Sequence, residues 1–188
     1  MDRTINTVQE AVAGRAPGSW LASDRITPQT GPPDVYLHPG QHHIATSPVI
    51  LKMILGSCVG VFFFDRILAI GGATHFMLPH QRTGLPSPRY GDVAIKQLLE
   101  EFRGLGSRHL EAKIFGGASM LIALRGLQGS HIGQIGQKNA ETALEILAKE
   151  RIVITEKNLL DERCRKVSMV SNTGATTLEF VGNADGNR

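Results

Sequence analysis

The order of apolar and polar positions predicts strands and helices over most of the chain after residue 34. Apolar runs rich in β-branched and aromatic residues, bounded by turn residues, predict strands at 49–55, 58–64, 69–78, 110–115, 151–155, 166–170 and 175–181. Apolar side chains spaced about 3.6 residues apart predict helices at 91–103 and 134–149. Antiparallel pairs outnumber clear parallel crossovers, so we expect an α+β fold. It would have mixed, largely antiparallel β-sheets with a β-sandwich-like core, flanked by two or three helices.

The first 34 residues differ from the rest in composition. Prolines lie among Gly, Ser and Thr without a sustained period, at Pro17, Pro28, Pro32 and Pro33. Such a segment is typical of a loop or linker, so it predicts a flexible N-terminal leader at 1–34. We expect one folded domain at 35–182 and a disordered tail at 183–188.

Charge and hydropathy exclude several classes of function. The net charge is +3 and the basic residues are scattered, which does not indicate a nucleic-acid surface. No apolar run approaches the roughly 20 residues that span a bilayer, so we expect no membrane insertion. Cys58 and Cys164 are the only cysteines, too few for a disulfide framework. We therefore expect free thiols and a cytoplasmic location.

The main candidate chemistry lies in Gly56-Ser57-Cys58, which His75 follows seventeen positions after the cysteine. A hairpin loop at 65–68 would place Cys58 directly opposite His75, with Cβ atoms about 4.5–5.5 Å apart. An imidazolium there would lower the thiol pKa, and the pair would serve as nucleophile and base of a hydrolase that attacks a carboxamide. Gly56 permits a tight turn whose N–H groups would bind the oxyanion. A buried cysteine in an ordinary core is the alternative.

The amino-acid segments around this pair indicate a function more specifically than the spacing of Cys58 and His75 does. The segments are LGSCVGVFFFD at 55–65, GGATHFMLP at 71–79, RYG at 89–91, AKIFGGASM at 112–120, and IG and IGQKN between 132 and 139. This order of segments resembles the chemoreceptor glutamine deamidase (CheD) family. The resemblance implies that Cys58 is the nucleophile and His75 the general base, without cofactor or metal, in converting receptor glutamines to glutamate with release of ammonia. It also implies a fold like that of toxin-type cysteine deamidases.

The resemblance further implies the partners. The substrates would be the cytoplasmic helices of chemoreceptors (methyl-accepting chemotaxis proteins), and a CheC-like chemotaxis phosphatase is a further candidate partner. A long helix needs an open groove, whose candidate lining residues are Phe76, Arg89, Tyr90, Gly116, Gly117 and Ser119.

The chain departs from the family pattern at three places, one of which is Ser119, where the family commonly has asparagine. The family's third catalytic residue is a threonine six positions before the cysteine, where this chain has Lys52. Thr46, Ser57 or a backbone carbonyl remain as candidates to orient His75, and Lys52 could instead lie beside Cys58 and lower its pKa. The segment 158–164 replaces a glycine-rich acidic stretch. The alternatives are therefore a different small cysteine amidase, a transglutaminase-like protein, or a catalytically weakened module that binds receptors or the phosphatase.

Other reactive side chains favour structural roles. His38, His42 and His43 cluster without an adjacent Cys or carboxylate, and strand alternation would place His43 on the opposite face from His42. We therefore expect no metal site. Cys164 lies among basic residues but has no nearby histidine in sequence, so we interpret it as a surface cysteine.

Overall fold

The structure is a computed structural model that describes residues 31–119 and 134–181. Most of the predicted leader at 1–34 and the whole predicted tail at 183–188 lie outside the described residues. The domain boundaries therefore remain predictions.

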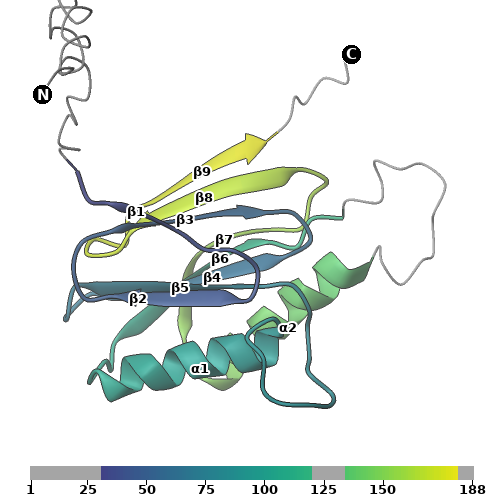
Figure 1. Cartoon of the computed structure of the whole chain (residues 1–188), viewed down its shortest axis with the longest axis horizontal. Helices are drawn as coiled ribbons and strands as arrows, with labels where there is room; N and C mark the ends of the chain where they lie inside the picture. Colours follow the sequence, from purple (N-terminus) through teal and green to yellow (C-terminus); the bar gives the residue numbers. More distant parts are fainter. Residues whose placement is uncertain (1–30, 120–133, 182–188) are drawn as a thin grey trace, which may run out of the picture. The chain divides into compact units, whose positions relative to one another are not determined.

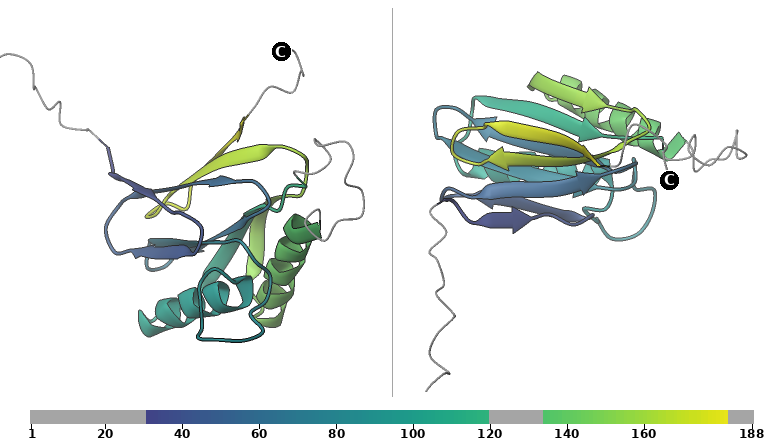
Figure 2. Two further views of the ribbon diagram at one scale, coloured as in Figure 1. Left: turned by 45° about the vertical axis from the view of Figure 1, so that its right-hand side comes forward. Right: turned by 90° about the horizontal axis from the view of Figure 1, so that it is seen from above.

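Two β-sheets stack on each other, and helices cover the far side of the larger sheet (Figures 1 and 2). The four-stranded sheet has the order β1-β3-β8-β9, with β1 at Asp34–Tyr36, β3 at Ile50–Leu55, β8 at Cys164–Val170 and β9 at Thr176–Val181. The five-stranded sheet has the order β2-β5-β4-β6-β7, with β2 at Gln41–Ala45, β5 at Ile70–Phe76, β4 at Val59–Asp65, β6 at Leu110–Gly116 and β7 at Val153–Leu159. The helices are α1 at Gly91–Gly104 and α2 at Ile135–Lys149.

This architecture confirms the predicted α+β class. The β1–β3 and β6–β7 pairs are parallel, and the other strand pairs are antiparallel. The strands β1 and β2 were not among the predicted elements. Both lie at sheet edges, and β2 carries two histidines, so neither has the continuous apolar run of a buried strand.

Alternation along the strands builds two separate cores. In β4 every residue is buried because the strand lies between the other sheet and the helices. Val59, Val61 and Phe63 pack toward α1 and α2, where Phe63 meets Phe102 with ring centroids 6.0 Å apart. Phe62 points into the layer between the sheets and meets Phe115 at 5.7 Å.

The β4–β5 hairpin differs from the predicted register. Asp65 pairs with Ile70, so the loop is 66–69 rather than 65–68. The reason is the Asp65 carboxylate, whose Oδ1 accepts the Ile67 and Leu68 N–H groups at 2.9 and 3.0 Å and so keeps Asp65 in the ladder. His75 consequently lies opposite Gly60, and the prediction that it directly opposes Cys58 is wrong.

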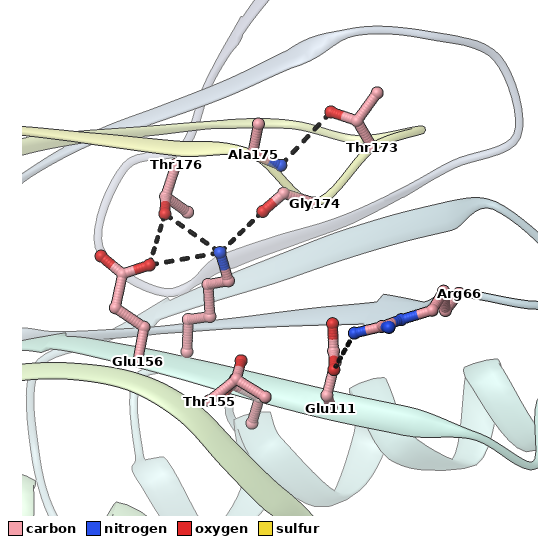
Figure 3. Close-up of polar contacts among 10 residues, drawn as sticks. Arg66, Glu111, Thr155, Glu156, Thr173, Gly174, Ala175 and Thr176 are labelled. Carbon is pink, nitrogen blue, oxygen red and sulfur yellow. Dashed lines mark hydrogen bonds and ion pairs between the residues drawn. The ribbon is translucent and has the colours of Figure 1, made fainter.

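Hydrogen bonds and an ion pair link the two sheets where β6 and β7 face the start of β9 (Figure 3). Lys113 on β6 donates from Nζ to the Gly174 carbonyl at 2.8 Å and to Thr176 Oγ1 at 3.1 Å, both on the β8–β9 side. The same ammonium lies 3.2 Å from Glu156 on β7, which also accepts from Thr176 at 2.5 Å. Ion pair and hydrogen bonds therefore satisfy the one lysine that points between the sheets from β6.

Candidate functional site

Cys58 lies where the chain crosses from one sheet to the other. It occupies the bend between the end of β3 at Leu55 and the start of β4 at Val59. Its side chain is half-buried and packs against the core between the sheets. His75 shares that side of β5 with Ala73, which belongs to the same core. Cys58 therefore precedes Gly60, the strand partner of His75, by two residues and lies one residue beyond the end of the β4–β5 ladder.

His75 is held by a backbone carbonyl. The residue is 2% exposed, and its Nδ1 lies 2.9 Å from the Leu37 carbonyl oxygen. The Leu37 N–H in turn donates to the Lys52 carbonyl at 2.8 Å. Within the described residues, the buried Nε2 has no hydrogen-bond partner. When Nδ1 carries the proton toward Leu37, Nε2 keeps a free lone pair that can accept a proton.

Burial keeps both members of the pair neutral. It raises the pKa of the Cys58 thiol, which a contact with its own backbone N–H offsets only in part. Burial also lowers the pKa of His75, the Leu37 carbonyl opposes this, and the neighbouring His38 lowers it further. The prediction that an imidazolium lowers the thiol pKa is wrong, because desolvation penalises the charged form of each group. At neutral pH these two directions favour an uncharged thiol and an uncharged imidazole.

The turn after β6 lies directly against the Cys58 segment. Gly117 N–H donates to the Cys58 carbonyl, and Ala118 N–H donates to the Gly56 carbonyl, each at 2.8 Å. Gly116 has a φ of 113°, and a β-carbon there would collide with the Cys58 carbonyl. The two glycines thus permit this close approach of two backbone segments.

Arg165 supports the same turn from the other sheet, a role that sequence reasoning missed. It is completely buried on β8 and donates to the Gly116 carbonyl at 3.1 Å, to Asn158 Oδ1 at 2.6 Å and to the Leu160 carbonyl. A buried guanidinium needs such acceptors. Arg165 lies one residue before the predicted strand at 166–170, so the sequence pattern gave no signal that it would be buried.

Of the candidates for orienting His75, Lys52 and Thr46 lie away from the ring, whereas a backbone carbonyl contacts it. Lys52 alternates with the buried Leu51 and Met53, and its Nζ pairs with Asp34 at 2.5 Å, so it does not lie on the Cys58 side. Thr46 is exposed and follows Ala45, which pairs with Gly71 at the opposite end of β5 from His75. The Leu37 carbonyl contacts Nδ1, as described above.

The groove candidates fall into different surroundings. Phe76 is completely buried and packs against Gly91 of α1, so it cannot line an exposed groove. Arg89 is exposed and Tyr90 half-buried at the start of α1, and the Arg89 carbonyl accepts the Met77 and Leu78 N–H groups at 3.0 Å. Ser119 is half-buried, and its N–H donates to the Asp161 carbonyl at 2.8 Å.

In the described parts of the chain, no three His, Cys, Asp or Glu side chains converge as metal ligands. His42 instead pairs through Nε2 with Glu101 of α1 at 2.9 Å. Neither of the described helices has the length and apolarity that crossing a bilayer requires.

Comparison with known proteins identifies the family to which the chain belongs. A thiol and an imidazole with a free ring nitrogen are the groups that cysteine hydrolases use. The family described as CheD chemotactic sensory transduction matches residues 77–180. Proteins named probable chemoreceptor glutamine deamidase CheD are similar over most of the chain. The one from Sulfurimonas denitrificans is 37% identical over 78% of this chain and 93% of its own length.

Two further relatives carry related names. The probable chemoreceptor glutamine deamidase CheD 1 of Anaeromyxobacter dehalogenans is 36% identical over 82% of this chain and 92% of its own length. The CheD protein of Ralstonia nicotianae is 38% identical over 72% of this chain and 58% of its own length. This chain belongs to the CheD family.

Proposed function

We propose that this protein deamidates glutamine side chains of chemoreceptors, with Cys58 as nucleophile and His75 as general base. The observation that carries the proposal is the buried His75 ring, whose Nδ1 is fixed by the Leu37 carbonyl while Nε2 has no partner among the described residues. A base that is held in one orientation with one free nitrogen is prepared to take a single proton.

The neutral resting pair suits this chemistry. His75 Nε2 removes the Cys58 proton as sulfur attacks the side-chain carbonyl of glutamine, which forms a tetrahedral oxyanion. The imidazolium returns that proton to the leaving nitrogen, and ammonia departs as the C–N bond breaks. Water, deprotonated by the same Nε2, then attacks the thioester. The C–S bond breaks, the thiol is restored, and glutamate remains on the substrate.

Backbone groups around Cys58 would stabilise the oxyanion. The segment at Gly56, Ser57 and Cys58 lies outside both sheets, so strand pairing does not consume all of its N–H groups. N–H groups that are already oriented stabilise developing negative charge without reorganisation. Ser57 and Gly56 therefore act through the main chain in this mechanism, and the orienting role belongs to the Leu37 carbonyl rather than to Thr46.

The substrate is the helical cytoplasmic region of a chemoreceptor, and the protein acts in the cytoplasm. Arg89, Tyr90 and Ser119 are the remaining candidates for the groove that admits an exposed glutamine, because Gly116 and Gly117 are buried like Phe76. A CheC-like phosphatase is a proposed regulatory partner.

The test is incubation with a cytoplasmic chemoreceptor fragment, followed by ammonia measurement and mass spectrometry of its glutamines. Wild type should convert specific glutamines to glutamate. Cys58→Ala should abolish conversion, and Cys164→Ala is the matched control that should retain it. Unchanged receptor fragments with wild type, across several cognate receptors, would refute the proposal.

The same assay separates the alternatives. Hydrolysis of free glutamine or small amides but not of receptor fragments would identify a different amidase. Binding of receptor fragments without turnover would identify a binding module.

A further inference from the structure

Helix α2 reaches the Cys58 segment through Asn139. This side chain is completely buried, and its Nδ2 donates to the Ser57 carbonyl at 3.0 Å and to the Met77 carbonyl at 2.9 Å. Ser57 immediately precedes Cys58, and Met77 follows His75 by two residues. One amide group therefore joins the two segments that carry the candidate nucleophile and base.

The Cys58 segment needs such support because it is not part of a strand. Its main-chain bonds to Gly117 and Ala118 lead to the turn after β6, and α2 packs against that turn as well. Gly136, one helical turn before Asn139, lies so close to the Gly117 and Ala118 carbonyls that a β-carbon would overlap them. The N-terminal part of α2 thus supports the Cys58 segment directly and through the turn.

The chemistry of Asn139 argues for a role beyond filling the core. Its Oδ1 is buried and, among the residues that the structure describes, has no hydrogen-bond partner. An unsatisfied buried acceptor is destabilising, and a leucine of similar size would avoid that penalty. The two donor contacts are what an asparagine supplies here and an apolar side chain cannot.

We propose that Asn139 is a positioning residue that fixes the placement of Cys58 relative to His75 by binding the Ser57 and Met77 carbonyls together. This inference rests on the proposed function, because proton transfer between sulfur and Nε2 requires that placement. Asn139 itself does not touch the substrate. A displacement of about 1 Å at a reacting pair can cost about 100-fold in rate, which sets the scale of the effect.

The experiment compares wild type with Asn139→Leu and with Ser107→Ala. The leucine removes both donors at similar size. Ser107 is equally buried and hydrogen-bonds Asp65 at the opposite end of β4 from Cys58, so its loss destabilises the fold without touching the site. Each protein is assayed for kcat and KM on a chemoreceptor fragment, and for the pH dependence of Cys58 alkylation by iodoacetamide, followed at that residue by mass spectrometry.

Asn139→Leu should lower kcat by about 10- to 100-fold while KM changes by no more than about twofold. The midpoint of Cys58 alkylation should move to lower pH, because a released segment admits water and removes the cause of the raised pKa of Cys58. Cys58 of the variant would thus be alkylated faster at neutral pH, while the variant would deamidate the receptor fragment more slowly. Ser107→Ala should change neither reading, which separates positioning from general stability.

A folded Asn139→Leu protein with wild-type kcat and alkylation midpoint would overturn the inference. If that variant does not fold, Asn139→Ala removes both donors without adding bulk, and the same two measurements decide. If wild type deamidates no receptor fragment while the variant still moves the alkylation midpoint, the proposed function fails and the positioning role stands. If both proteins deamidate equally, the positioning role fails and the proposed function stands.

Discussion

Replacement of Asp65 by asparagine should destabilise the protein in a pH-dependent way. Asp65 is 1% exposed, and burial alone would raise its pKa. Hydrogen bonds from Ser107 and from the N–H groups of Leu68, His109 and Ile67 outweigh burial and lower the pKa of Asp65 to about 2. These donors bind the carboxylate and so favour its charged form in the folded state.

The magnitude follows from the shift. A decrease from 3.8 to about 2, at about 1.4 kcal/mol per pKa unit, corresponds to about 2 kcal/mol of stability at neutral pH. Because the folded-state pKa is the lower one, this contribution is complete well above pH 3.8 and is lost as the pH falls through about 2. About half of it should remain at pH 3.

The assay is urea unfolding of wild type and Asp65→Asn between pH 3 and pH 7. The free-energy difference should be about 2 kcal/mol at pH 7 and should shrink toward pH 3. Asp34→Asn is the control, because that carboxylate is half-exposed and its pair with Lys52 should contribute less than about 1 kcal/mol. A difference that is independent of pH, or smaller than that of the control, would refute the reasoning.

Two further predictions concern the places where the chain departs from the family pattern. Leu160 and Asp161 have positive φ values of 66° and 78°. Leu160→Gly should therefore stabilise the protein by about 0.5–1 kcal/mol in urea unfolding, because glycine avoids the left-handed strain but costs more chain entropy. Val153→Gly, at an exposed position in β7, should be destabilising instead, and a destabilised Leu160→Gly would contradict the strain argument. Lys52→Ala and Lys52→Thr should leave kcat within about twofold of wild type, because the side chain lies on the outer face of β3 while the main chain holds Leu37. A gain or loss of about tenfold in kcat would show that the side chain at this position takes part.

Much of the fold could be predicted from the sequence because local patterns determine it. The strands β3 to β6 and both helices lie within a few residues of their predicted limits, since apolar alternation and helical spacing are properties of short segments. The α+β class followed from the order of these segments. The strands β1 and β2 escaped detection because their side chains are mostly exposed or half-buried.

The sequence is sufficient to single out Cys58 and His75 as candidates, but it does not determine their geometry. Cys58 and His75 stand in segments whose wording resembles the CheD family, and the chain belongs to that family. The hairpin register depended on where the Asp65 carboxylate found its hydrogen-bond donors. Because the loop begins one residue later than predicted, the strand partner of His75 is Gly60 instead of Cys58.

Only the tertiary structure decided what surrounds the pair. The Leu37 carbonyl is invisible in a sequence because every residue has one, and its contact with His75 depends on how β1 and β2 are connected. Asn139 and Arg165 reach the site from α2 and β8, far from Cys58 along the chain. The pKa of Cys58 is raised rather than lowered for the same reason: desolvation depends on which segments pack around a group, and no local pattern specifies that packing.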